Sequence, residues 1–185
     1  SQFRGIFKSA CVACASLATG DLITQGFEYK QGELQEWNKI RTLRFAVVGL
    51  TLHGPYFHLG FGRVERLFGA SSGFKIAVAK MAVSQITLFP IYLSLLFPYL
   101  SLLEGKSLQA AYEKTAQVWW PTFRNGALFW PVVNMVNFLA FSPGTGRVLC
   151  VSVAGIIWNC YISAVNFKAN KLQQQALQGE QAVKE

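Results

Sequence analysis

Long apolar runs without a charged side chain dominate the pattern along the chain. Each run is close to the roughly 20 residues that a helix needs to cross the hydrocarbon core of a bilayer. The four clearest runs are residues 45–62, which include two histidines, and residues 81–103, 125–146 and 148–167. A fifth, more polar run covers residues 9–27 and contains one charge, Asp21. The pattern predicts an all-α, polytopic transmembrane helical bundle with four to five membrane segments.

Turn residues and prolines divide these runs. The stretches Ala70–Gly73 and Glu104–Lys106 carry turn signals, and Ser142–Gly146 is a tight turn that predicts a hairpin between the last two segments. Pro90 and Pro98 are expected to kink the third segment, because proline removes a helical hydrogen bond.

One further helix is predicted at the membrane surface. Residues 107–120 place apolar side chains on one side and polar ones, including Lys114, largely on the other. This amphipathic helix ends at Trp119-Trp120, and indole rings concentrate at the headgroup boundary. The polar residues 168–185 are expected to extend the last helix beyond the bilayer, which divides the chain into a transmembrane domain, 1–167, and a polar extension, 168–185.

The first segment is the weakest candidate for a full span, so we expect four full spans with one segment short, tilted or shielded. Its small residues Ala10, Cys14 and Ala18 repeat every four positions, a spacing that lets helix backbones approach closely. Basic residues divide almost evenly between the two possible faces, so the positive-inside rule assigns no orientation.

Composition supports a membrane protein. Charged residues make up 14% of the chain, against roughly 25% in soluble domains. The net charge of +8 suits contact with anionic lipid headgroups. The basic residues are scattered at segment ends and form no patch, so we expect no nucleic-acid partner. The Cys11/Cys14 pair lacks a second pair at zinc spacing, so we interpret both as packing residues and expect neither metal nor cofactor.

Polar side chains inside the apolar runs are the candidate functional residues, because an ionisable group at membrane depth is costly to place. Asp21 is expected either to line a wet path, to pair with Arg44 or Arg147, or to sit near the interface. His53 and His58 flank the Gly54-Pro55 break and are expected mainly to form hydrogen bonds there. The candidates for a polar interior or pore are Asp21, Gln25, His58, Gln85, Asn134 and Asn137.

Buried amides need partners in hydrocarbon, so Asn134 and Asn137 are expected first to join helices. The sequence contains no nucleophile elbow, no glycine-rich phosphate loop and no pair of carboxylates deep in the fold. We therefore expect no enzymatic activity.

Several short motifs occur in order along nearly the whole chain. They are LATGDLITQ at 17–25, Arg41, Arg44, Gly49, Gly54–His58, Lys80, Ser84-Gln85, Pro90, Trp130–Asn134, Asn137-Phe138, Pro143, Arg147 and Trp158–Ser163. Together they resemble the motifs of the Mpv-seventeen and 22-kilodalton peroxisomal membrane protein family. Ser84 stands where that family usually has an acid, and Asn134 stands where it generally has glutamine.

The resemblance implies a small protein of the mitochondrial inner membrane or, alternatively, of the peroxisome or another organelle. It implies channel-like solute flux or a maintenance role in the inner membrane, without established enzymatic activity. The alternative is an accessory structural subunit of a large inner-membrane assembly, contacting other subunits through residues 107–120 and the tail. Residues expected in interhelical packing and pairing are Arg44, Gly54, Pro55, Trp130, Pro131, Arg147, Trp158 and Asn159.

Overall fold

A computed structural model of the chain describes residues 2–69, 73–140 and 145–184, and within these ranges it contains helices and no strand. The all-α fold expected from the apolar runs is confirmed. The elements are α1 (Gln2–Lys30), α2 (Lys39–Val48), the π-helix η1 (Gly49–His53), α3 (Gly54–Phe68), α4 (Phe74–Ile86), α5 (Leu88–Leu103), α6 (Leu108–Ala140) and α7 (Thr145–Lys184).

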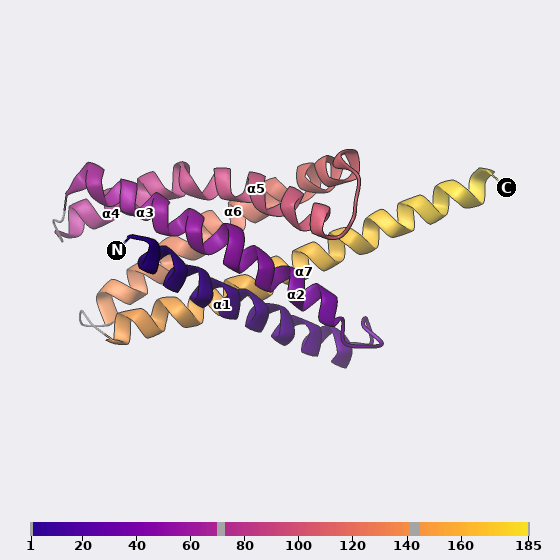
Figure 1. Cartoon of the computed structure of the whole chain (residues 1–185), viewed down its shortest axis with the longest axis horizontal. Helices are drawn as coiled ribbons and strands as arrows, with labels where there is room; N and C mark the ends of the chain where they lie inside the picture. The colour runs from indigo at the N-terminus through magenta and orange to yellow at the C-terminus, as the bar shows by residue number, and fades with distance from the viewer. Residues whose placement is uncertain (1, 70–72, 141–144, 185) are drawn as a thin grey trace.

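The helices pack as an elongated bundle (Figure 1). Helix α1 lies against α7 on one side and against the continuous run α2–η1–α3 on another. Helices α4 and α5 return along α3, and α6 packs on α5 before α7 runs back beside it. The α1–α2 connection and the α5–α6 connection lie at the same end of the bundle (Figure 1).

Small residues bring α1 into backbone contact with its neighbours. A Cβ atom on Gly54 would lie 2.4 Å from the Cα atom of Ala10, and one on Gly49 would lie 2.6 Å from the Cα atom of Cys14. A Cβ atom on Gly20 would lie 2.6 Å from the Cβ atom of Asn159 on α7. The small side chains spaced four residues apart on α1 thus allow η1 and α3 to pack closely against it, as the sequence predicts.

The core follows α5, whose inward face is almost entirely apolar. Its largest members include Leu93, Leu96 and Phe97, which are 1% exposed or less. Trp158 of α7 packs against this core and lies beside the ring of Phe89. Many apolar side chains on the outside of the bundle are exposed, as a lipid-facing surface requires.

The break at Gly54-Pro55 takes the form of a π-turn. The N–H of Gly54 donates to the carbonyl of Gly49, five residues earlier, and α3 begins with Pro55 in its first turn. Proline has no N–H and is tolerated at the start of a helix. The π-turn therefore ends the hydrogen-bond pattern of α2 just before Pro55, which has no N–H to continue it.

The third segment is divided where proline was expected to disturb it. Helix α4 ends at Ile86, Thr87 separates the two helices, and α5 begins at Leu88 with Pro90 in its first turn. Pro98 lies inside α5 without ending it.

Residues 107–120 do not form a separate helix. The first turns of α6 cover residues 108–120, and α6 continues through Pro121 and Pro131 to Ala140. Lys114 lies on the buried side, not on the outward polar side that the sequence predicts, because Glu104 faces it across the α5–α6 connection. The predicted turns at 70–73 and 142–146 fall largely outside the described residues.

Helix α7 extends well beyond the others (Figure 1). It continues without a break from Thr145 to Lys184, so the polar extension does prolong the last helix. The beginning of this polar extension still contacts the bundle, since Ala169 is 3% exposed and Gln173 donates to the carbonyl of Ala110 at 2.8 Å.

Two helical stretches of the described residues are long and apolar enough to cross a bilayer, Phe3–Lys30 and Phe74–Leu103. The first of them contains the segment that the sequence ranks as the weakest candidate. Helix α1 reaches this length because it begins seven residues before the apolar run 9–27 and ends three residues after it.

Candidate functional site: two buried polar clusters

The first buried cluster, called here the Asp21 cluster, is centred on an arginine with two acids. Arg41 of α2 approaches Asp21 through Nε, at 2.7 Å from Oδ1, as an ion pair without a hydrogen bond. Its two terminal nitrogens bind the two carboxylate oxygens of Glu28, at 2.5 and 3.1 Å. The guanidinium carbon also lies 4.8 Å from the ring centre of Phe167 on α7. Asp21 and Glu28 are both buried, at 0% and 6% exposed, so the structure does place two carboxylates together inside the bundle, where the sequence predicts no such pair.

Neutral side chains complete the cluster. Ser163 of α7 donates to Asp21 Oδ1 at 2.6 Å and accepts from Arg41 Nη2 at 2.7 Å. Thr42 and Gln25 both donate to Asp21 Oδ2, at 2.6 and 2.7 Å. Asp21 thus receives three hydrogen bonds and one ion pair, which offset much of the cost of burying a carboxylate.

Local sequence explains how these groups meet. Asp21, Gln25 and Glu28 are four and three residues apart, so they share one face of α1. The Asn38 side chain accepts the N–H of Arg41 and caps α2 at its start, which fixes Arg41 in the first turn. Gln25 holds the connector in place by accepting the Asn38 N–H at 2.7 Å.

The second buried cluster, called the Glu104 cluster, lies between α5, α6 and α7. Glu104 Oε2 is 3.0 Å from the Lys114 ammonium and 3.5 Å from that of Lys106. Its other oxygen, Oε1, accepts from Asn166 at 2.8 Å and from Asn170 at 2.9 Å. Lys106 also donates to Asn170 and Gln173 of α7.

The charges of the Glu104 cluster shift one another's protonation. Burial alone would raise the pKa of Glu104, but Lys114 and the amide hydrogen bonds outweigh it, and the pKa falls below its usual value. Burial lowers the pKa of Lys114 to about 8, with Glu104 opposing the shift and Lys106 and Arg44 adding to it. The carboxylate is therefore the more firmly charged member of this pair.

Arg41 follows the α1–α2 connection and Glu104 lies in the α5–α6 connection. These two connections lie at the same end of the bundle (Figure 1). The two clusters approach α7 only three residues apart, at Ser163 and Asn166. Asp21 lies nine residues before the end of α1, about 14 Å along the helix axis. The end of the bundle thus contains acids and bases in its interior.

The residues predicted to form a polar interior do not all meet. Asp21 and Gln25 lie together in the Asp21 cluster, with Arg41 as the cation in place of Arg44 or Arg147. His58 instead bonds to Ser9 of α1 at 2.9 Å.

Two other candidates, Gln85 and Asn134, lie apart from the Asp21 cluster. Gln85 on α4 has a buried amide nitrogen without a partner among the described residues. Asn134 donates to the carbonyl of Trp130 in its own helix, at 2.8 Å, so this bond joins no second helix. The side chains of Asn137 and Arg147 lie outside the described part of the structure.

The predicted packing residues are distributed along the bundle. Gly54 contacts α1, while Trp130 lies 6.1 Å from Trp158, ring centre to ring centre. Asn159 donates to Ser16 of α1 at 2.9 Å. Pro55 starts α3 and Pro131 lies within α6. Arg44 is half-buried on α2, on the side of the Glu104 cluster.

Sequence reasoning did not assign Arg41, Glu28 or Ser163 to the polar site, although Arg41 and Ser163 lie in the family motifs, and it did not predict the Glu104 cluster. Glu28 was detectable, because it shares a helical face with Asp21 and Gln25. The Glu104 cluster was harder to find, since its members come from two distant stretches of the chain, residues 104–114 and 166–173. Among the described residues, no three His, Cys, Asp or Glu side chains are grouped as metal ligands.

Comparisons with known proteins identify the family. The sequence profile described as "Mpv17 / PMP22 family" matches residues 101–163. The chain is 30% identical to "PXMP2/4 family protein 4" of Dictyostelium discoideum, over 79% of this chain and 78% of that protein. It is 34% identical to "Protein SYM1" of Mycosarcoma maydis, over 79% of this chain and 72% of that protein.

A third relative carries its location in its name. This is "Mitochondrial inner membrane protein Mpv17" of Caenorhabditis elegans, 27% identical over 85% of this chain and 84% of that protein. No solved structure matches the chain. The family resemblance and the mitochondrial location expected from the motifs are both confirmed. The chain belongs to the Mpv17 / PMP22 family and is a membrane protein of the mitochondrial inner membrane.

Proposed function

We propose that the chain is a non-enzymatic membrane protein that conducts a small polar or charged solute, with the Asp21 cluster as its closed constriction. The observation that carries this proposal is the burial of Asp21, Glu28 and Arg41 where α1, α2 and α7 meet. Ionisable residues within membrane segments are expensive and commonly mark solute or ion paths.

The net charge of the Asp21 cluster determines which ions the constriction would favour. Two carboxylates share one guanidinium, so the cluster carries a formal charge of −1 when both acids are ionised. A site of this charge attracts cations and repels anions. Opening requires Arg41 to exchange one carboxylate for water or solute, which makes Arg41 the residue that holds the path shut.

Planar bilayer recordings of the purified protein test the proposal. Wild type is expected to give cation-selective openings, and Asp21→Asn to reduce the cation selectivity. Glu33→Gln, in the exposed α1–α2 connector, is the matched charge control and should behave as wild type. Bilayers that stay sealed at high protein load, with native folding checked by circular dichroism, would refute conduction.

A second candidate is an accessory structural subunit of a larger inner-membrane assembly. It is favoured by α7, which projects past the bundle with Leu172 and Leu177 each 61% exposed (Figure 1). Exposed leucines on a free helix suit contact with another protein. Native gels after mild solubilisation test this role: a small free species would exclude it, and a large species that shrinks on removal of residues 174–185 would support it.

A further inference from the structure

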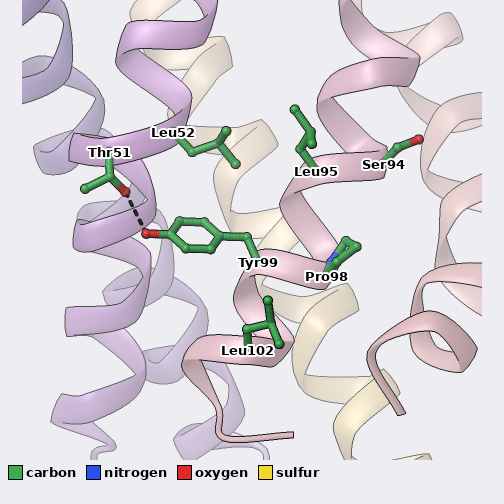
Figure 2. Close-up of a pocket in the computed structure, with 7 residues that line it drawn as sticks. All are labelled: Thr51, Leu52, Ser94, Leu95, Pro98, Tyr99 and Leu102. Atoms are coloured by element: carbon green, nitrogen blue, oxygen red, sulfur yellow. Dashed lines mark hydrogen bonds between the residues drawn. The ribbon is translucent and has the colours of Figure 1, made fainter. Parts of the chain in front are cut away.

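An open groove runs between η1 and α5 on the outside of the bundle. It has a volume of about 370 Å³. Figure 2 shows Leu52 on one wall and Leu95 and Leu102 on the other. The lining residues are Thr51, Leu52, Ser94, Leu95, Pro98, Tyr99 and Leu102.

The polar side chains that line the groove already have partners within the protein. Thr51 donates to the carbonyl of Val47 at 2.7 Å and bonds to the Tyr99 hydroxyl at 3.0 Å (Figure 2). The Ser94 hydroxyl donates to the carbonyl of Pro90 and accepts from the Trp119 ring N–H. With these groups satisfied, the groove presents a mainly apolar wall, which suits a hydrocarbon chain.

One end of the groove lies beside an excess of positive charge. Leu102 is two residues before Glu104, where Lys106 and Lys114 meet a single carboxylate. Arg44 adds a third cation, because its charge acts on Lys114. Three cations and one carboxylate leave a formal surplus of +2.

Arg44 is the cation best placed to receive an outside ligand. It is half-buried and has no hydrogen bond or ion pair among the described residues, whereas Lys106 and Lys114 both contact Glu104. It precedes Thr51 by seven residues, about two helical turns or 10 Å, and so lies near the same face of the α2–η1 run. A ligand with an anionic head and an apolar tail matches this arrangement.

We propose that the groove between η1 and α5 binds an acyl chain of one anionic phospholipid, whose phosphate neutralises Arg44 beside the Glu104 cluster. Basic pockets at the boundary of membrane helices bind acidic lipid headgroups in this way. The surplus charge explains why a neutral phospholipid would bind less tightly in the same groove. This site is separate from the Asp21 cluster and does not depend on solute conduction.

Native mass spectrometry of the full chain in detergent, with added phosphatidylglycerol or phosphatidylcholine, measures the binding. We expect phosphatidylglycerol to be retained in preference to phosphatidylcholine. Arg44→Gln should weaken phosphatidylglycerol binding about fivefold, the factor that one basic residue contributes toward an anionic lipid surface. Lys171→Gln, an exposed lysine on α7, removes the same charge elsewhere and should leave binding unchanged.

A second pair of variants tests the groove. Leu95→Trp should fill it and displace the lipid, whereas Ile91→Trp, one turn away on α5 and outside the lining, should not. Equal losses from Arg44→Gln and Lys171→Gln would overturn the proposal, as would full binding to Leu95→Trp. Competition by glycerol phosphate alone would also overturn it, because that result assigns the site to a free anion. Circular dichroism of each variant distinguishes loss of the site from loss of the fold.

Discussion

At the scale of single residues, the described structure concentrates its buried charge in a few side chains with several partners each. Arg41 contacts two acids, a serine and an aromatic ring, and Glu104 contacts two lysines and two asparagines. Removing one member of such a group leaves the others charged in an apolar interior. Substitutions there are therefore expected to cost more than any one contact suggests.

Replacing Arg41 should destabilise the protein strongly. Arg41→Met leaves Asp21 and Glu28 buried without a cation, and breaking a buried pair in this way costs about 3–5 kcal/mol. The free energy of unfolding in mixed micelles is the measurement. Arg63→Met is the control, because Arg63 is exposed on α3 and should lose less than about 0.5 kcal/mol. Equal losses in the two variants would contradict the central role of Arg41.

Replacing Glu104 should produce a pH-dependent loss. The lowered folded pKa of Glu104 means that the carboxylate contributes stability above its unfolded pKa of 4.5, and that this contribution disappears as the pH falls through the lower folded pKa. Glu104→Gln should therefore cost about 1.5–3 kcal/mol at neutral pH, the range for hydrogen bonds to a charged group, and progressively less below pH 4.5.

Thermal unfolding at several pH values measures this effect. Glu113→Gln carries the same change on the exposed side of α6 and should show no such pH dependence. A loss for Glu104→Gln that stays constant from neutral to acidic pH would show that the side chain acts by packing alone.

At the scale of elements, glycine positions decide how closely the helices approach. Gly49→Val should cost about 1–3 kcal/mol, because its added atoms would overlap the α1 backbone at Ala13 and Cys14. Gly62→Ala, inside α3 with no atom within 4 Å of the new Cβ, should stabilise the protein by about 0.5–1 kcal/mol. Unfolding in denaturant measures both changes. A loss for Gly62→Ala would contradict the open space beside α3.

The helical segments and most of their breaks were predictable from local signals. Charge-free runs predict the apolar helices, and Gly54-Pro55 and Pro90 predict where the helical ladder changes. The continuity of α6 was not predictable, because Pro121 and Pro131 usually argue for a break and are tolerated here inside a packed helix.

The polar site was predictable only in part. Asp21 and Gln25 were identified because they interrupt an apolar run, and their common helical face was readable from their spacing. The choice of Arg41 over Arg44 was not readable, since it depends on how α2 is rotated against α1. The sequence predicts an outward Lys114 because local periodicity cannot reveal that the carboxylate of Glu104, in the preceding α5–α6 connection, faces it.

At the scale of the whole molecule, the boundary between bundle and extension is predicted to fall inside α7, which runs unbroken from Thr145 to Lys184. The sequence predicts it after Phe167, and we predict that the stable bundle extends to Gln173, because Asn170 and Gln173 bond to Glu104 and Lys106 in the α5–α6 connection. Ending the chain after Gln173 should leave the melting temperature within about 1 °C of wild type, because the residues removed are exposed where described. Ending it after Lys168 should lower the melting temperature, since Glu104 and Lys106 lose amide partners.

Circular dichroism melts of both truncated chains in the same detergent measure the difference. Substituting both Asn170 and Gln173 by alanine in the full-length chain should reproduce the second loss. Two truncations with the same melting temperature would place the boundary at Phe167.

The π-turn η1 changes the helical phase between α2 and α3, so these two helices of the second segment direct their side chains to different neighbours. It adds one residue between Val48 and Gly54, so the phase of α3 is offset from that of α2 by about 100°. Arg41 can therefore face Asp21 of α1 and Ser163 of α7 while the His53 ring bonds to the Tyr92 hydroxyl of α5. Deleting one residue from η1 would remove this offset. If α2 then kept Arg41 against Asp21 and Glu28, His53 would be rotated away from Tyr92 and lose its hydrogen bond.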